Sequence, residues 1–163
     1  MSAHDRQREI TLRFLAAPMD INLYGNVHGG AVMKWIDEAA YACAAGWCGQ
    51  YCVTVYVGGI RFYRPIHIGE LVELHARLLH TGRTSMHISV DVSAADPRDN
   101  HYEQKTHCVI VFVAIDADGK PIEVPKWQPT TPEDRELQQY AVKLMELSKA
   151  IEDEIKPYQP GHG

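Results

Sequence analysis

The sequence lacks the spacings that mark metal and redox sites. Its 163 residues include four cysteines and nine histidines, yet no Cys-x-x-Cys, His-x-x-x-His or His-Glu-x-x-His motif occurs. Zinc-binding and thioredoxin-like interpretations are therefore weak, and no metal is expected. The cysteines at 43, 48, 52 and 108 are instead expected to be buried free thiols, as in a reducing compartment.

Other signatures are also missing. There is no Gly-x-Ser-x-Gly elbow of a serine hydrolase and no phosphate-binding loop with its lysine. No apolar run approaches the roughly 20 residues that span a bilayer, and residues 1–9 are polar, unlike a signal peptide. The net charge of −5 argues against a general nucleic-acid binder. We therefore expect a cytoplasmic protein without membrane or nucleic-acid partners.

What the sequence does contain is alternation of apolar and polar residues. Residues 10–15, 72–78 and 86–92 alternate as half-buried antiparallel strands do. Residues 52–57 are β-branched and aromatic, and we expect Gly58 and Gly59 to mark a bulge or a close approach before the strand resumes over 60–63. Residues 107–115 are apolar on both faces, which indicates a central strand whose second face is covered, with a partner subunit as one candidate.

Two helices complete the pattern. Residues 31–45 are mostly apolar or small and predict a buried helix that ends near Gly46, whereas residues 133–155 form a charged helix. Its apolar stripe at helical spacing indicates docking on its own domain or on a neighbouring subunit. The fold class is therefore α+β, an antiparallel sheet wrapped around one central helix, with an extra C-terminal helix after a proline-rich connector.

One acid stands alone in the apolar helix. Asp37 has apolar neighbours, and such a carboxylate is costly unless its charge is satisfied. It is either a structural acid, hydrogen-bonded to backbone donors or paired across an interface, or a catalytic carboxylate desolvated by its surroundings. The helix follows a loop that ends in Gly29 and Gly30, so its N-terminal N–H groups are uncovered and could bind a carbonyl oxygen as an oxyanion hole does.

An ordered series of motifs resembles the hotdog-fold acyl-CoA thioesterases, in particular the bacterial short-to-medium-chain acyl-CoA hydrolases and the related cytosolic acyl-CoA hydrolases of animals. The series covers residues 10–125 and comprises Asp20-Ile21-Asn22, Gly25-Asn26-Val27-His28-Gly29-Gly30, Met33, Trp35-Ile36-Asp37, Cys52-Val53-Thr54-Val55, Ile60-Arg61-Phe62, Pro65-Ile66, Gly69-Glu70-Leu71-Val72, Gly82-Arg83-Thr84-Ser85-Met86 and Asp116-Ala117-Asp118-Gly119-Lys120-Pro121. The resemblance implies a hotdog domain over 1–125, followed by the connector and helix over 126–163.

The resemblance also implies a site and a reaction. Asp37 would activate water or attack the thioester directly, helped by Asn22 from the neighbouring subunit of a homo-oligomer built from dimers, a trimer of dimers. Gly29 and Gly30 would hold the thioester oxygen. The substrate would be a fatty acyl-CoA, with coenzyme A as product and no cofactor. Substrate-binding residues would be His28, Thr54, Gly82, Arg83, Thr84 and Ser85, the last four toward the CoA phosphates.

Two other functions stay open at this point. A hotdog dehydratase or hydratase pairs a histidine with an acid, and His28 with Asp37 would suit it. His28 stands where the family often has phenylalanine, so it would alter the acyl entrance or supply a proton to the leaving sulfur. A non-catalytic acyl-CoA sensor is the second alternative, although a pure binder needs neither Asn22 nor Asp37.

Overall fold

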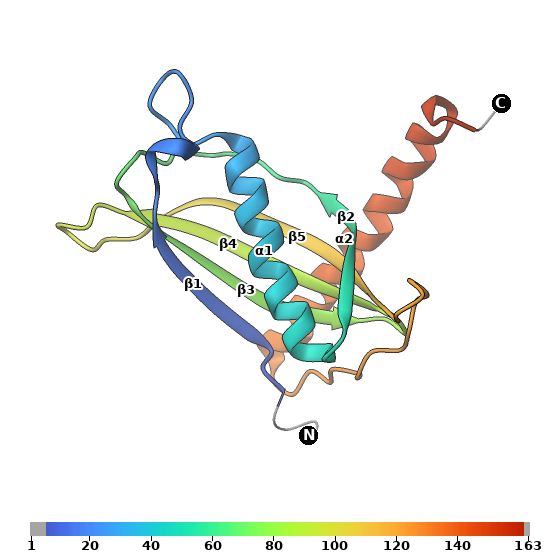
Figure 1. Ribbon diagram of the computed structural model, residues 1–163. Helices are drawn as coiled ribbons and strands as arrows, with labels where there is room; N and C mark the ends of the chain where they lie inside the picture. The colour runs from blue at the N-terminus through green and yellow to red at the C-terminus, as the bar shows by residue number, and fades with distance from the viewer. Residues whose placement is uncertain (1–5, 162–163) are drawn as a thin grey trace.

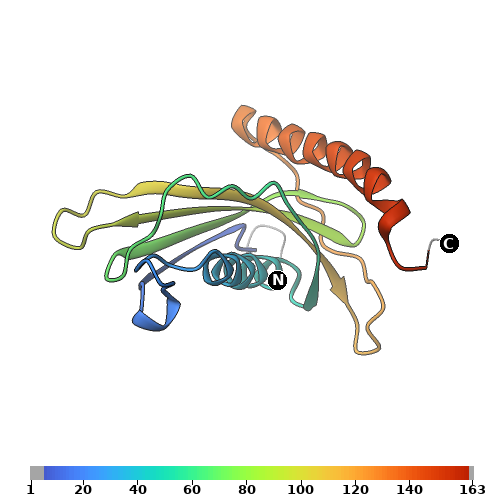
Figure 2. The same ribbon diagram turned by 90° about the horizontal axis from the view of Figure 1, so that it is seen from above.

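The computed structural model describes residues 6–161, which form one five-stranded antiparallel sheet with a helix on each side. The elements in chain order are β1 (Glu9–Leu15), the 3₁₀ turn η2 (Pro18–Asp20), α1 (Gly29–Cys48), β2 (Tyr51–Gly58), β3 (Leu71–Thr81), β4 (Ser85–Ala95), β5 (Glu103–Ile115), α2 (Pro132–Ile155) and the 3₁₀ turn η3 (Lys156–Tyr158). The α+β hotdog architecture is confirmed, because the curved sheet wraps around α1 while α2 lies on its outer face (Figures 1 and 2).

The strands lie in the order β1-β3-β4-β5-β2, so β5 is interior, as its apolar character indicated, and β2 is an edge. The residues of β3 that alternate as apolar are fully enclosed, as are their counterparts on β4; they are Val72, Leu74, Ala76, Leu78, Met86, Ile88, Val90 and Val92. These side chains meet α1 across the inner face of the sheet. The main hydrophobic core therefore lies between the sheet and α1.

The helix α1 approaches the sheet closely because its buried face carries small residues. Ala39, Ala40 and Ala44 have no exposed surface, and alanine favours helix while occupying little volume. The helix α1 ends two residues beyond Gly46, and the glycine that caps it is Gly49. The helix continues to Cys48, and Gly49 adopts the left-handed conformation at φ 69° while its N–H donates to the Ala45 carbonyl at 2.8 Å.

The predicted resumption of a strand over residues 60–63 is also wrong, because β2 ends at Gly58 and an irregular connection follows. The bulge lies between Thr54 and Tyr56, not at the glycine pair. Gly58 does permit a close approach: a Cβ there would lie 2.3 Å from the Tyr56 hydroxyl. The approaching group is thus a side chain of the same strand.

The outer face of the sheet is more covered than simple alternation predicted. His87 and Ser89 on β4 point away from α1 and are nevertheless buried. Their cover is α2, whose Ala141 packs on Leu79 and Val109. The helix predicted over residues 133–155 is therefore docked on its own sheet, the first of the two alternatives.

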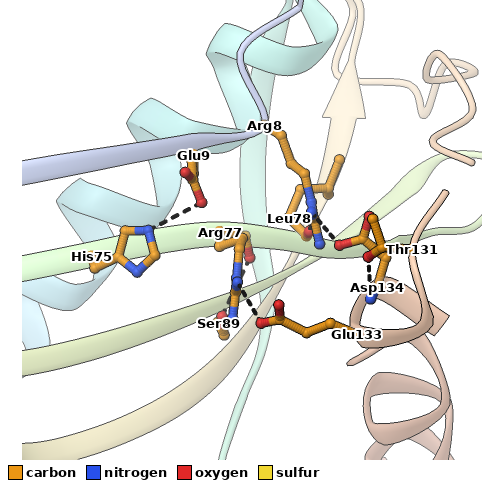
Figure 3. Close-up of polar contacts among 9 residues, drawn as sticks. All are labelled: Arg8, Glu9, His75, Arg77, Leu78, Ser89, Thr131, Glu133 and Asp134. Atoms are coloured by element: carbon orange, nitrogen blue, oxygen red, sulfur yellow. Dashed lines mark hydrogen bonds and ion pairs between the residues drawn. The ribbon is translucent and has the colours of Figure 1, made fainter. Parts of the chain in front are cut away.

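Polar contacts fix the start of α2 against β3 and against Arg8, the residue before β1 (Figure 3). Thr131 caps the helix by accepting a hydrogen bond from the Asp134 N–H at 3.1 Å. Arg8 donates to the Asp134 carboxylate at 2.5 Å, and the Arg77 guanidinium lies 3.4 Å from Glu133. The second half of α2 extends past the edge strand β2 (Figure 1), and a groove of about 690 Å³ lies between α2 and the sheet. Within residues 6–161, no helix combines the length and apolarity needed to cross a membrane.

Candidate active site

The start of α1 presents open backbone donors. His28 occupies the N-cap position, but its side chain makes no capping hydrogen bond. A Cβ at Gly30 would meet no atom within 4 Å, and one at Gly29 would touch only the Phe62 ring at 3.4 Å. The first N–H groups of a helix lack intrahelical acceptors and favour negative charge. This terminus can therefore receive an oxyanion.

The loop before α1 is closed on itself by Asn22. Its side-chain oxygen accepts hydrogen bonds from the N–H groups of Tyr24 at 2.9 Å and Asn26 at 3.2 Å. The Asn22 N–H in turn donates to the Asn26 carbonyl at 2.7 Å. The backbone N–H of His28 donates to the Asp20 carbonyl at 2.7 Å, which ties the loop to the helix start. The structure thus brings Asn22, His28, Gly29 and Gly30 into one region.

Asp37 lies in the middle of α1, on the side that faces the edge strand β2. The Thr54 hydroxyl donates a hydrogen bond to the Asp37 carboxylate at 2.6 Å. Asp37 is half-buried in the chain, not enclosed by apolar neighbours as expected. The sequence does not predict the contact between Thr54 and Asp37, because the two residues are seventeen positions apart and belong to a strand and a helix.

These two regions are separate within one chain. Gly30 and Asp37 lie seven residues apart on the same helix, and a rise of 1.5 Å per residue separates them by roughly 10 Å along the axis. A single thioester carbon cannot touch both the helix start and Asp37 of one chain. The open helix start and Asp37 are therefore two separate regions of one chain.

The turn from Gly82 to Ser85 forms a third region, at the other end of the sheet from the glycine loop (Figure 1). The Ser85 side chain approaches Gly82 closely, because a Cβ at Gly82 would lie 2.4 Å from the Ser85 hydroxyl oxygen. The Arg83 side chain is 78% exposed and lies 3.9 Å from Glu123. The backbone of Thr84 accepts from the Ala114 N–H at 3.1 Å. Backbone hydrogen bonds therefore tie the turn to the neighbouring chain, and the arginine side chain is mostly exposed.

The fold and the open helix start define the class of protein. The model of the thioesterase superfamily matches residues 24–100. The acyl-CoA thioester hydrolase YciA of Salmonella typhimurium is 36% identical over 123 residues, which cover 73% of this chain and 92% of the relative. The chain belongs to this superfamily, within its acyl-CoA thioester hydrolases.

Solved structures of acyl-CoA thioesterases have the same fold. An apo hexameric acyl-CoA thioesterase is 31% identical, with a TM-score of 0.82 and coverage of 87% of this chain and 91% of the other. The acyl-CoA hydrolase of Staphylococcus aureus, solved with butyryl coenzyme A, coenzyme A and coenzyme A disulfide, is 27% identical, with a TM-score of 0.84 and coverage of 92% of each chain. That enzyme was also solved in three variants that carry alanine in place of an asparagine, an aspartate or a threonine. The aspartate follows the asparagine by fifteen residues, and the threonine follows the aspartate by seventeen.

Proposed function

We propose that this protein hydrolyses fatty acyl-CoA thioesters to the free acid and coenzyme A, with Asp37 as its catalytic carboxylate. The observation that carries the proposal is the hydrogen bond of 2.6 Å from Thr54 to Asp37. A hydroxyl that donates to one carboxylate oxygen fixes the orientation of the other, so Thr54 acts as a positioning residue. This arrangement suits a carboxylate that must meet a reactant at a defined angle.

The reaction needs few groups, because a thioester is already activated. Asp37 accepts a proton from water while the water oxygen bonds to the carbonyl carbon, and the carbonyl electrons move to the oxygen held by the N–H groups at Gly29 and Gly30. The carbon–sulfur bond then breaks and the CoA thiolate takes a proton. If Asp37 instead attacks directly, an anhydride forms and water cleaves it to the same products. A single turnover in heavy-oxygen water that leaves label in the Asp37 carboxylate would identify direct attack, with water then opening the anhydride at the Asp37 carbonyl.

We propose that the open helix start and Asp37 are two halves of an active site, and that these halves meet across a dimer. The edge strand β2 exposes apolar side chains, with Tyr51 74%, Val53 41% and Val55 53% exposed. Edge-to-edge pairing of β2 with a second copy would satisfy the open backbone groups of the edge strand and cover these side chains. The helix start and Asn22 of one copy could then face Asp37 of the other. The hexameric state of the relative solved without ligand supports such an assembly.

The spacing of the residues chosen for substitution in the Staphylococcus aureus enzyme supports the assignment. Asn22, Asp37 and Thr54 are the same three residue types with the same separations of fifteen and seventeen residues. The loop that carries Asn22 uses its side-chain oxygen for the backbone, so its amide hydrogens remain to orient the substrate. The exposed Arg83 on the turn from Gly82 to Ser85 would attract the CoA phosphates.

Release of free thiol from acyl-CoA esters of increasing chain length tests the hydrolase proposal. We expect turnover by the unaltered protein and a loss of at least about 100-fold in kcat for Asp37→Asn. Glu38→Gln is the matched control, because Glu38 is the adjacent carboxylate and lies 3.8 Å from Lys34 on the exposed side of the helix. Equal rates for Asp37→Asn and Glu38→Gln would reject Asp37 as the catalytic group.

Mixed oligomers test the shared site. If each site combines Asn22 of one copy with Asp37 of another, co-expressed Asn22→Ala and Asp37→Asn chains regain about a quarter of the active sites by random pairing. If each site lies within one chain, the mixture stays as inactive as its components. Light scattering on the same samples must show an oligomer, and a monomer would contradict the shared site.

The same assay separates the alternatives. Tight binding of acyl-CoA without release of thiol for any ester would favour a sensor. Turnover of an enoyl-CoA by addition of water, lost in His28→Phe as well as in Asp37→Asn, would favour a hydratase. His28 is exposed at the N-cap, and we propose that it contacts the acyl group in the hydrolase.

A further inference from the structure

Two thiols lie in contact where α1 passes into β2. Cys48 is the last residue of α1 and Cys52 is the second residue of β2. Their Sγ atoms are 3.5 Å apart, and both face the Gln50 carbonyl oxygen, at 3.7 Å from Cys48 and 3.5 Å from Cys52. Both side chains are buried, but the Gly49–Gln50 reversal that joins the two elements is exposed.

The surroundings distinguish this pair from the other two cysteines. The hydrogen bond from Cys52 lowers the pKa of the Cys48 thiol, and the nearby charge of Arg6 acts in the same direction; the pKa of Cys52 is raised because its proton is held in that bond. Burial raises the pKa of Cys43 to about 12 and that of Cys108 to about 11. Thiolates, not thiols, react with oxidants, so Cys43 and Cys108 serve as internal controls.

We propose that Cys48 and Cys52 form a dithiol–disulfide site that a hydroperoxide oxidises. The Cys48 thiolate attacks the peroxide, its sulfur is oxidised to sulfenic acid, and the O–O bond breaks to release water or alcohol. The Cys52 sulfur then displaces hydroxide, which takes up the Cys52 proton, and the disulfide forms. The sulfur atoms must approach by about 1.5 Å to reach bonding distance, and the Gly49–Gln50 reversal is the segment that would adjust.

A search for the Cys-x-x-Cys motif does not find this pair of cysteines. A Cys-x-x-Cys motif brings two thiols together within one helical turn, whereas here the chain leaves a helix, reverses at Gly49 and enters a strand. Three residues separate the cysteines, so only the tertiary path shows that they meet. The site shares no residue with the proposed hydrolase, and failure of either proposal leaves the other standing.

The full-length Cys43→Ser/Cys108→Ser variant tests the proposal, because it keeps only the proposed pair. Mild hydrogen peroxide should remove both remaining thiols, lower the mass of the monomer by about 2 Da and be reversed by dithiothreitol. The Cys48→Ser/Cys52→Ser variant keeps Cys43 and Cys108, and its thiols should react at least about tenfold more slowly. Circular dichroism checks that both variants fold.

Three results would overturn the proposal. One is retention of both thiols in Cys43→Ser/Cys108→Ser under conditions that oxidise free glutathione. Another is a gain of oxygen mass without the 2 Da loss, which would mean that the sulfurs cannot approach. The third is a disulfide between chains instead of within one, which non-reducing electrophoresis would reveal.

Discussion

His87 should make the stability of this fold depend on pH. It lies on the outer face of β4, only 4% exposed, with the His80 ring centroid 5.2 Å from its own. Burial, reinforced by the charge of His80, lowers the pKa of His87 to about 4 from 6.5. Burial lowers the pKa of His80 as well. The folded state therefore holds both rings neutral where the unfolded chain would protonate them.

The sign and the size of the change in stability with pH follow from proton linkage. Because the unfolded state binds more protons below pH 6.5, stability is complete above that pH and falls as the pH drops toward 4. A shift from 6.5 to about 4 corresponds to about 3 kcal/mol in total, of which about 2 kcal/mol is lost by pH 5. His80 adds to the loss in the same direction. This is a large fraction of the 5–15 kcal/mol typical of domains.

Denaturant unfolding at pH 8 and pH 5, at one protomer concentration, measures the effect. His87→Met replaces the ring with a side chain of similar volume that does not titrate, and it should reduce the loss between these pH values by about 2 kcal/mol. His101→Gln alters an exposed loop histidine and should keep the full loss. The same pH dependence in His87→Met as in the unaltered protein would refute the argument from burial.

Three further changes have defined outcomes. Thr131→Ala removes the N-cap of α2 and should lower the free energy of unfolding by about 1 kcal/mol, measured by denaturation beside Thr130→Ala. Gly49→Ala puts a side chain at φ 69° and should cost about 1 kcal/mol, whereas Gly46→Ala inside the helix should not destabilise the protein. Arg83→Ala should raise KM for acyl-CoA severalfold while kcat stays within about twofold, and an unchanged KM would discard its role toward the CoA phosphates.

The strands could be predicted from the sequence because a buried face imposes a period of two on β3 and β4. The end of α1 could not, because a glycine inside a helix costs only about 1 kcal/mol and the tertiary contacts of Trp47 and Cys48, both buried, outweigh it. Glycine at 49, not at 46, has the left-handed conformation that ends a helix. Composition does not distinguish these two positions, since both glycines follow apolar residues.

The sequence also does not show what covers the outer face of the sheet. A stripe of apolar residues on a helix shows that it docks, but not on what. Contacts between residues distant in sequence show that α2 docks on its own sheet; examples are Arg8 with Asp134 and Leu79 with Ala141. The same holds for Thr54 and Asp37, whose contact depends on how β2 lies along α1. The residue types identify the candidate residues, whereas only the three-dimensional path of the chain shows which of them are in contact.

Asp37 lies beside the open edge of the sheet. Within residues 6–161, β2 pairs with β5 alone, so its other edge carries open backbone groups beside exposed apolar side chains. Asp37 is directed to that same edge through Thr54, about 10 Å along the helix from the donors at Gly30. A second copy that pairs with β2 would therefore remove the exposed edge and enclose the carboxylate in the same step. On this reasoning, Val53→Lys, which places a charge on the edge, should abolish turnover and the oligomer together while the monomer keeps its fold.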